Sequence, residues 1–249
     1  MKKIVGITMG DPAGIGPEIS LKAFAKPALY DKCRPLLVGD KSVVDYYLAK
    51  HPELALEVNV ISQPKDGRYA FGTIDLIDLK IVDMATFHIG EVSHVGGDAA
   101  FQYVKKVIEL ALAKEIDATV TNPLNKEAMN AAGHHYAGHT EIYADLTGTD
   151  KYTMMLADGN LRVVHVSTHV SLREACDRAT KERVLDVIRI ADQACKDLGI
   201  ENPRVAVAGL NPHCGENGLF GREEIDEINP AVEAAKAEGI NVFGSLPAD

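Results

Sequence analysis

The residues Lys3-Ile4-Val5-Gly6-Ile7-Thr8-Met9-Gly10-Asp11-Pro12-Ala13-Gly14-Ile15-Gly16-Pro17-Glu18 combine a short apolar run, a glycine-rich loop and the start of a helical pattern. An apolar run that leads through a tight turn into a helix is the beginning of a βαβ unit, the repeating element of parallel sheets. The three glycines of the loop let the backbone turn sharply and bring its N–H groups close to a ligand. The helix predicted over residues 19–24 points its positive end at the same place. This stretch therefore predicts a class of fold and a candidate anion-binding loop. An ordinary tight turn explains the same glycines, and Asp11 can also act as a helix cap.

The same alternation of strand and helix continues along the chain. Amphipathic helical patterns cover residues 98–114, 180–198 and 223–238, the last of them interrupted by Pro230. The strand-like apolar runs are residues 3–8, 35–38, 58–61, 118–121, 152–156, 161–166, 205–210 and 240–244. We therefore expect an α/β fold with three layers, α/β/α, around a mostly parallel sheet. Residues 63–83, with their proline, glycines and aspartates, predict instead a loop and an antiparallel excursion.

Composition excludes several classes of function. The 249 residues are 46% hydrophobic, and 26 Lys and Arg face 36 Asp and Glu, a formal net charge of -10. This balance argues against a nucleic-acid partner and against an anionic membrane surface. No uninterrupted apolar segment approaches membrane-spanning length. The four cysteines form no CxxC pair, so we expect reduced thiols in a cytoplasmic protein.

A second group of polar residues follows the apolar run 118–121. Lys126 comes shortly after this run and is placed to meet an anion at the carboxyl edge of the sheet. His139 and Thr140 stand where the helical pattern 141–146 begins, and donors at a helix N-terminus suit a phosphate or a carboxylate. Thr140 can equally be the N-cap of that helix. Two further histidines of this loop are expected to face solvent: His134 and His135.

Two more histidines follow strand-like runs in the last third of the chain. His169 ends the string His165-Val166-Ser167-Thr168-His169, and His213 lies in Gly209-Leu210-Asn211-Pro212-His213-Cys214-Gly215-Glu216. Open α/β sheets bind ligands outside the carboxyl ends of their strands, so His169 and His213 form a candidate pair of metal ligands. Either histidine taken alone is more often structural. Imidazole ligands suit Zn, Co or Ni, and Mg only if carboxylates or waters complete the site.

Four strings, in order along the whole chain, resemble the 4-hydroxythreonine-4-phosphate dehydrogenase family of vitamin B6 synthesis. They are Gly10 through Glu18, Gly138-His139-Thr140-Glu141, Ser167-Thr168-His169, and Gly209 through Gly218. The resemblance implies two α/β subdomains with the active site in the cleft, as in isocitrate and isopropylmalate dehydrogenases. A helix and a strand end near Asn122, so we place the subdomains at residues 1–122 and 123–249. The family continues further, so we expect the second subdomain to be truncated.

The resemblance also implies an activity. The family oxidises a secondary alcohol of a 4-phosphorylated 3-hydroxy acid with NAD, and the resulting β-keto acid loses CO2. It implies a homodimer with the active site at the interface and a divalent metal, commonly zinc, held by three histidines. His169 and His213 match two of these, and His139 and Thr140 match substrate-binding positions. We assign Lys126 and Asp11 as candidate catalytic residues and identify no residue that binds the cofactor.

Two strings point to a paralogous branch of the family. Pro123-Leu124-Asn125-Lys126-Glu127 and His165 through His169 are closer to the enzymes that act on 4-phospho-D-threonate or 4-phospho-D-erythronate. The substrate therefore stays open between these two acids and 4-hydroxythreonine 4-phosphate. The alternatives from other classes are a metal-dependent phosphate-ester hydrolase, and a catalytically incomplete fragment that binds a phosphorylated metabolite.

Overall fold

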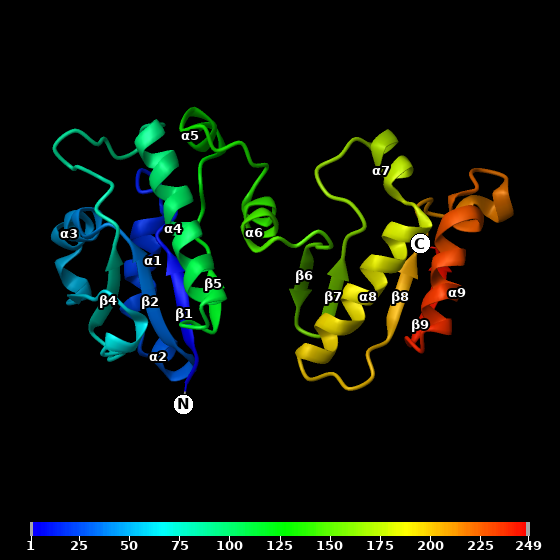
Figure 1. Cartoon of the computed structure of the whole chain (residues 1–249), viewed down its shortest axis with the longest axis horizontal. Coiled ribbons are helices and arrows are strands. Elements are labelled where there is room, and N and C mark those ends of the chain that lie inside the picture. Colours follow the sequence, from blue (N-terminus) through cyan, green and yellow to red (C-terminus); the bar gives the residue numbers. More distant parts are fainter. Residues whose placement is uncertain (1, 248–249) are drawn as a thin grey trace. The chain divides into compact units, whose positions relative to one another are not determined.

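A computed structural model describes residues 2–247, and the chain divides into two compact units, Met1–Thr149 and Asp150–Asp249 (Figure 1). The first unit extends past the boundary predicted at Asn122. It includes helices α5 (Lys126–Ala131) and α6 (His139–Thr147) because both pack against helix α4 (His94–Leu112). Phe101 and Ile108 of α4 form one apolar cluster with Met129 of α5 and Ile142 of α6. No helix of the described residues is long and apolar enough to cross a membrane.

Among its described residues, the first unit contains a five-stranded sheet in the order β3-β4-β2-β1-β5, and every neighbouring pair is parallel. Its strands are β1 (Ile4–Thr8), β2 (Arg34–Gly39), β3 (Glu57–Val60), β4 (Thr73–Asp78) and β5 (Ala118–Val120). Its other helices are α1 (Gly16–Phe24), α2 (Pro27–Lys32) and α3 (Lys41–Lys50), with short 3-10 turns η1 (Pro52–Leu54) and η2 (Pro64–Asp66).

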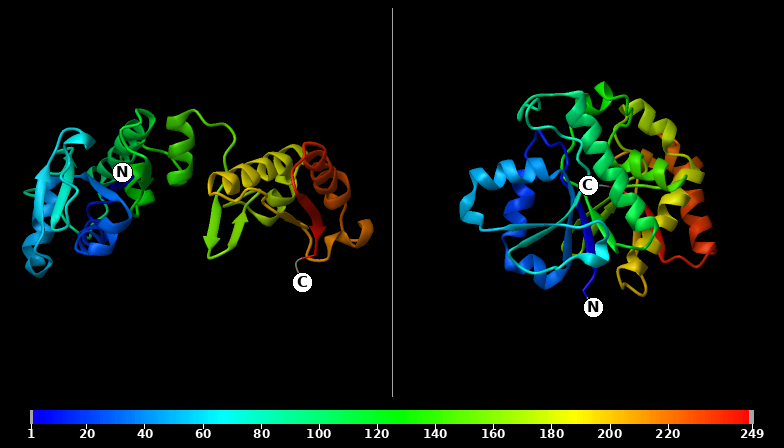
Figure 2. Two further views of the ribbon diagram at one scale, coloured as in Figure 1. Left: turned by 90° about the horizontal axis from the view of Figure 1, so that it is seen from below. Right: turned by 60° about the vertical axis from the view of Figure 1, so that its left-hand side comes forward.

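Helices cover both faces of this sheet. Successive residues Leu36, Leu37 and Val38 of β2 point to opposite faces, and all three are 0% exposed. Helix α4 packs on β1 and β2, and Figure 2 shows it lying across the first strand. Such continuous burial is characteristic of parallel sheets with a helical layer on each side. The prediction of an α/β fold with a mostly parallel sheet is confirmed.

The prediction of an antiparallel excursion within residues 63–83 is wrong. This segment contains β4, which pairs in parallel with β2 and β3 inside the sheet. Asp75 was one of the aspartates that indicated a loop instead of a buried strand, and it is 0% exposed. Its carboxylate accepts hydrogen bonds from Asn59 Nδ2 (2.7 Å), from the Arg68 amide (3.0 Å) and from the Tyr69 amide (2.7 Å). A buried carboxylate is tolerated when its oxygens are paired in this way.

The glycine-rich loop between β1 and α1 is tightly packed. Gly10 has φ +75°, and a Cβ built on it would lie 2.5 Å from the carbonyl oxygen of Pro123. A Cβ on Gly16 would lie 2.1 Å from the carbonyl oxygen of Met9. Both contacts are with backbone atoms, which cannot move aside as a flexible side chain can. The glycines are therefore required by the close approach of β1, α1 and the residues after β5.

The second unit is built around helix α8 (Lys181–Asp197). In its described residues, β6 (Met155–Asp158) and β7 (Leu161–Val164) form an antiparallel pair, and β8 (Val205–Ala208) and β9 (Val242–Leu246) form a parallel pair. Val184 and Ile188 of α8 pack with Val232 and Ala235 of helix α9 (Asn229–Ala237). The remaining elements are α7 (Leu172–Arg178), a 3-10 turn η3 (Cys214–Gly218) and a π-helical turn η4 (Glu224–Ile228).

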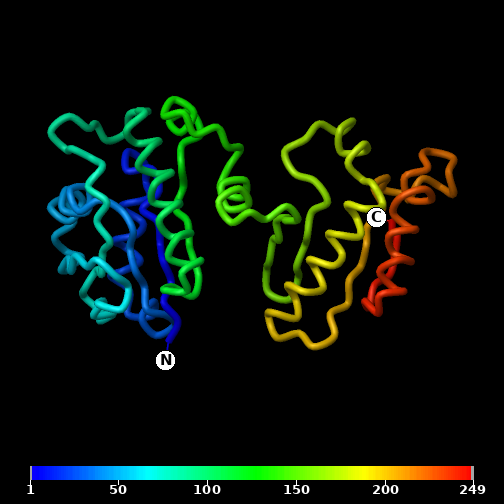
Figure 3. Tube along the Cα trace, in the orientation of Figure 1, coloured from blue at the N-terminus to red at the C-terminus, as the bar shows by residue number. Residues whose placement is uncertain are grey.

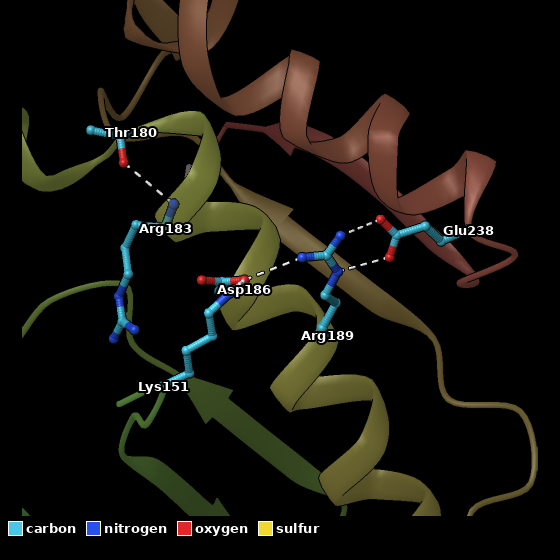
Figure 4. A network of polar contacts seen from close by, with 6 residues as sticks. All are labelled: Lys151, Thr180, Arg183, Asp186, Arg189 and Glu238. Carbon is cyan, nitrogen blue, oxygen red and sulfur yellow. Dashed lines mark hydrogen bonds and ion pairs between the residues drawn. The ribbon is translucent and has the colours of Figure 1, made fainter. Parts of the chain in front are cut away.

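Polar side chains of α8 connect it to the rest of this unit (Figure 4). Asp186 pairs with Lys151 at 2.9 Å, next to the β6–β7 pair, and Arg189 makes two hydrogen bonds to Glu238 at the end of α9. Arg183 Nε donates to the carbonyl oxygen of Val166 at 2.9 Å. Exposed ion pairs contribute little stability, but the hydrogen bond to Val166 fixes the chain that leaves β7.

We predict that Gly16→Ala lowers the free energy of unfolding by about 2 kcal/mol or more, because its Cβ overlaps a backbone oxygen. Gly14→Ala is the matched control in the same loop, since its Cβ would meet the nearest atom at an ordinary 3.4 Å. It should change stability by less than about 1 kcal/mol in either direction. Urea unfolding of both variants checks this, and equal losses would contradict the packing argument.

Candidate active site

The carboxyl ends of β1 and β5 form a topological switch point in the first unit. The chain leaves β1 through α1 toward β2 on one side, whereas β5, on the other side of β1, leads into α5 and α6. Ligands of open α/β sheets bind in the crevice at such a point. The glycine-rich loop follows β1, and Asn122 and Pro123 follow β5. The switch point therefore brings together the two sequence strings that first suggested an anion site.

Asn122 links the two sides of the switch point. Its Nδ2 donates to the carbonyl oxygen of Thr8 at 2.9 Å and to Ser20 Oγ of α1 at 2.6 Å. Its own amide donates to Thr8 Oγ1 at 3.1 Å. The sequence predicted a subdomain boundary near Asn122 and no linking role for its side chain, although a polar residue directly after an apolar run was the signal for this role. The side chain is buried, so these bonds hold the edge of the site in a single geometry.

Asp11 lies inside the glycine-rich loop with 7% of its surface exposed. Its Oδ1 accepts the Ala13 amide at 2.9 Å, and its own amide donates to the Pro123 carbonyl at 2.9 Å. A Cβ on Gly96, in the first turn of α4, would lie 2.9 Å from the same Oδ1. Burial raises the pKa of Asp11, and the bond from Ala13 partly offsets this rise. These contacts hold the loop, and the catalytic assignment of Asp11 stays a prediction.

His139 is the first residue of α6 and is half-buried. Its ring donates a hydrogen bond to the backbone of Asn122, and its Nε2 is buried without a partner among the described residues. Burial lowers the pKa of His139, and the bond to Asn122 partly offsets this. Burial thus favours the neutral form of the ring. The substrate-binding role of His139 stays a prediction.

Thr140 and Lys126 lie at the N-termini of neighbouring helices. The N-cap of α6 is Gly138 and no side chain caps this helix, so the alternative role of Thr140 as N-cap is wrong. Thr140 is exposed in the first turn of α6, whose amides no side chain caps. Lys126 is exposed at the first position of α5, whose cap is Asn125. A cation is unfavourable at the positive end of a helix, so helix stability does not explain Lys126.

The expectation that His134 faces solvent is wrong. Its ring stacks on Phe101 with 3.8 Å between centroids, and its Nε2 lies 2.8 Å from Asp98 Oδ1. Phe101 and Asp98 are three residues apart on α4, so one face of the helix offers both a ring and a carboxylate. The neighbouring His135 is exposed, as expected.

His169 and His213 both belong to the second unit and are both exposed. They follow β7 and β8, which point the same way in Figure 1. Val166, shortly before His169, and Val207 of β8 pack against the same apolar cluster of α8 and α9. His169 has φ +58°, an uncommon conformation for a histidine. The structure thus places both histidines on loops at strand ends of one unit.

The side chains of His169 and His213 are of a type that binds divalent metals. Two imidazoles are common ligands of Zn, Co and Ni. Residues 2–247 contain no cluster of three or more His, Cys, Asp or Glu side chains that could hold a metal by themselves. A metal bound to His169 and His213 would complete its coordination with oxygens of a substrate, with water or with groups outside these residues. The assignment of the pair therefore stays a prediction.

A parallel sheet with a glycine loop, an uncapped helix and an imidazole with one unpartnered nitrogen near its switch point is typical of an α/β enzyme that binds a small molecule. The family model described as pyridoxal phosphate biosynthetic protein PdxA matches residues 31–249. The D-threonate 4-phosphate dehydrogenase of Pectobacterium atrosepticum is 46% identical over 249 residues, covering 100% of this chain and 76% of that protein. A protein of Symbiobacterium thermophilum provisionally given the same name is 51% identical over 248 residues, covering 100% of this chain and 74% of the relative.

The comparison with solved structures indicates the same family. The 4-hydroxythreonine-4-phosphate dehydrogenase of Klebsiella pneumoniae is 43% identical, with a TM-score of 0.92 over 99% of this chain and 74% of that chain. The chain therefore belongs to the PdxA family. This confirms the resemblance drawn from the four strings and the expectation that the protein is a dehydrogenase.

The lowered pKa of His139 predicts a pH-dependent stability. The unfolded chain protonates this ring near about pH 6.5, whereas the folded protein binds the proton only at lower pH. The free energy of unfolding should therefore fall as the pH drops through this window, because protons bind preferentially to the unfolded state. Urea unfolding between about pH 8 and about pH 5 should show a smaller fall in His139→Gln. His135→Gln, at an exposed histidine of the same unit, should behave like the wild type, and an unchanged profile in His139→Gln would contradict the argument.

Proposed function

We propose that this protein oxidises the secondary hydroxyl of a small 4-phosphorylated 3-hydroxy acid with NAD and then releases CO2 from the β-keto acid. The names of the relatives, D-threonate 4-phosphate and 4-hydroxythreonine-4-phosphate dehydrogenases, support this substrate class. The observation that carries the proposal is the buried, unpartnered Nε2 of His139 at the uncapped N-terminus of α6. A homodimer with the active site at its interface stays part of the proposal.

The first unit supplies the groups for binding an anion. The overall charge of -10 repels an anionic substrate, so binding needs local donors. Thr140 and the free amides of α6 provide neutral donors, and Lys126 provides a positive charge. His139 accepts a hydrogen bond from a substrate hydroxyl through Nε2. These groups fit an acid that carries a phosphate, a carboxylate and a hydroxyl within a few bonds of one another.

The proposed reaction needs a bound cofactor and metal as well as side chains of the protein. His169 and His213 would hold a divalent metal, which would supply a Lewis acid for the hydroxyl and the ketone, and NAD would supply the hydride acceptor. In the decarboxylation the bond to the carboxylate carbon breaks, CO2 leaves and the electron pair forms an enolate that needs one proton. We assign delivery of that proton to the Lys126 ammonium. Asp11 remains a candidate catalytic residue, and its carboxylate also accepts the Ala13 amide within the loop. No residue of this chain is assigned to NAD.

The test of this function is NADH formation in the presence of zinc, with 4-phospho-D-threonate, 4-phospho-D-erythronate and 4-hydroxythreonine 4-phosphate offered in parallel. We expect the highest kcat/KM with 4-phospho-D-threonate, because the relatives of 46% and 51% identity carry that substrate in their names. Release of CO2 in equal amount to NADH checks the decarboxylation. Release of inorganic phosphate without NAD would contradict the proposal and favour the phosphate-ester hydrolase.

Replacement of Lys126 tests its role as proton donor. Lys126→Met should lower kcat by about 10²- to 10⁴-fold, the usual contribution of a general acid. The thermal unfolding midpoint should stay unchanged because the side chain is exposed. Lys105→Met is the matched control, since it removes an exposed ammonium from α4 of the same unit. A Lys126→Met enzyme with wild-type kcat would remove Lys126 from the mechanism.

A further inference from the structure

The loop that carries His213 has an unusual backbone. After β8 the trace forms an extended loop before it enters α9 (Figure 3). Five successive residues have positive φ: Cys214 (52°), Gly215 (67°), Glu216 (49°), Asn217 (57°) and Gly218 (95°). Left-handed conformations of non-glycine residues cost free energy and persist only where the surroundings enforce them. Contacts elsewhere in the unit must therefore hold this loop.

Glu224 is the residue that holds it. It is 3% exposed, and its Oε1 accepts the amide of Asn211 at 3.0 Å. The side chain of Asn211 in turn accepts the amide of His213 at 3.0 Å through Oδ1. Two hydrogen bonds thus join the buried carboxylate to the backbone of His213. The carboxylate lies within the turn of the loop, because a Cβ on Gly209 or Gly215 would lie 3.1 Å from one of its oxygens.

Stability alone does not explain a carboxylate at this position. Oε2 of Glu224 is buried and has no hydrogen-bond partner among the described residues. A buried polar atom without a partner costs about 1–3 kcal/mol. An apolar side chain would avoid this cost but would offer no acceptor to Asn211. The acceptor at this position is therefore retained for the geometry of the loop.

The backbone of Glu224 is fixed by the packing of the helical segment that contains it. It begins the π-helical turn η4, which runs directly into α9. Ile228, at the end of the turn, is 3% exposed and packs in the cluster of α8 and α9. Pro230 follows at the start of α9, where the sequence predicted an interruption of the helix. Single π-helical turns of this kind are frequent at functional sites.

We propose that Glu224 is a positioning residue for His213: through Asn211 it sets the backbone from which the imidazole reaches a divalent metal. This inference rests on the proposed function, in which His213 is a ligand of that metal. It assigns to the second unit a residue that the sequence analysis did not single out. Groups that orient metal ligands in this indirect way typically contribute about 10- to 100-fold to metal affinity.

The test measures the zinc affinity of the full chain by competition with a chromogenic chelator. Glu224→Ala should weaken zinc binding by about 10- to 100-fold. Glu224→Gln should bind zinc within about threefold of the wild type, because its amide oxygen still accepts the Asn211 amide. Glu233→Ala, which removes an exposed carboxylate from α9, is the matched control and should leave the affinity unchanged. Loss of thermal stability in Glu224→Ala with wild-type zinc affinity would show a merely structural role and overturn the proposal.

A second variant and a double-mutant cycle complete the test. Asn211→Ala keeps the buried carboxylate but removes the acceptor for the His213 amide, so it should weaken zinc binding like Glu224→Ala. In a His213→Ala background, Glu224→Ala should have no further effect, because it acts through His213. The same factor in both backgrounds would overturn the proposal.

Different results would overturn the metal assignment and the positioning role. If His213→Ala binds zinc as tightly as the wild type, or the wild type binds none, the metal assignment and the positioning role fall together. If His213→Ala binds zinc more weakly while Glu224→Ala and Asn211→Ala bind it as tightly as the wild type, the metal assignment stands and only the positioning role is overturned.

Discussion

The hydrogen bonds of Asn122 are the constraint on which the first unit depends. They join Thr8 at the end of β1 to Ser20 in α1 across the switch point of the sheet. The loop between these residues can follow its path only because Gly10 and Gly16 have no side chain to meet the backbone packed against them. His139 donates to the backbone of the same asparagine, so the candidate binding edge and the core of the sheet share one anchor.

In the second unit, charged side chains fix the loops that carry His169 and His213. Arg183 holds the carbonyl oxygen of Val166 in the segment that leads to His169, and Glu224 holds the loop of His213 through Asn211. Both anchors start from helical segments that pack in one apolar cluster with β8. Exposed histidines on irregular loops are thereby given defined positions, which a pair of metal ligands requires.

Buried polar atoms without partners occur in both units. Among the described residues three side chains contain such an atom: His139, Arg162 and Glu224. His139 precedes Thr140 in the chain, and Glu224 is linked to the His213 amide through Asn211. Each such atom costs free energy of folding, so stability alone does not explain its presence.

The sequence by itself determined the alternation of strands and helices and, through four strings in order, the family. These signals are local, because an apolar run such as residues 3–8 or a glycine-rich turn is defined by neighbours along the chain. Tertiary structure alone decided the rest. Asp75 lies in a buried strand because Asn59, Arg68 and Tyr69 pair with it, and His134 stacks on Phe101 of α4. The roles of Asn122 and Glu224 likewise arise from contacts between residues far apart in sequence, which no local pattern records.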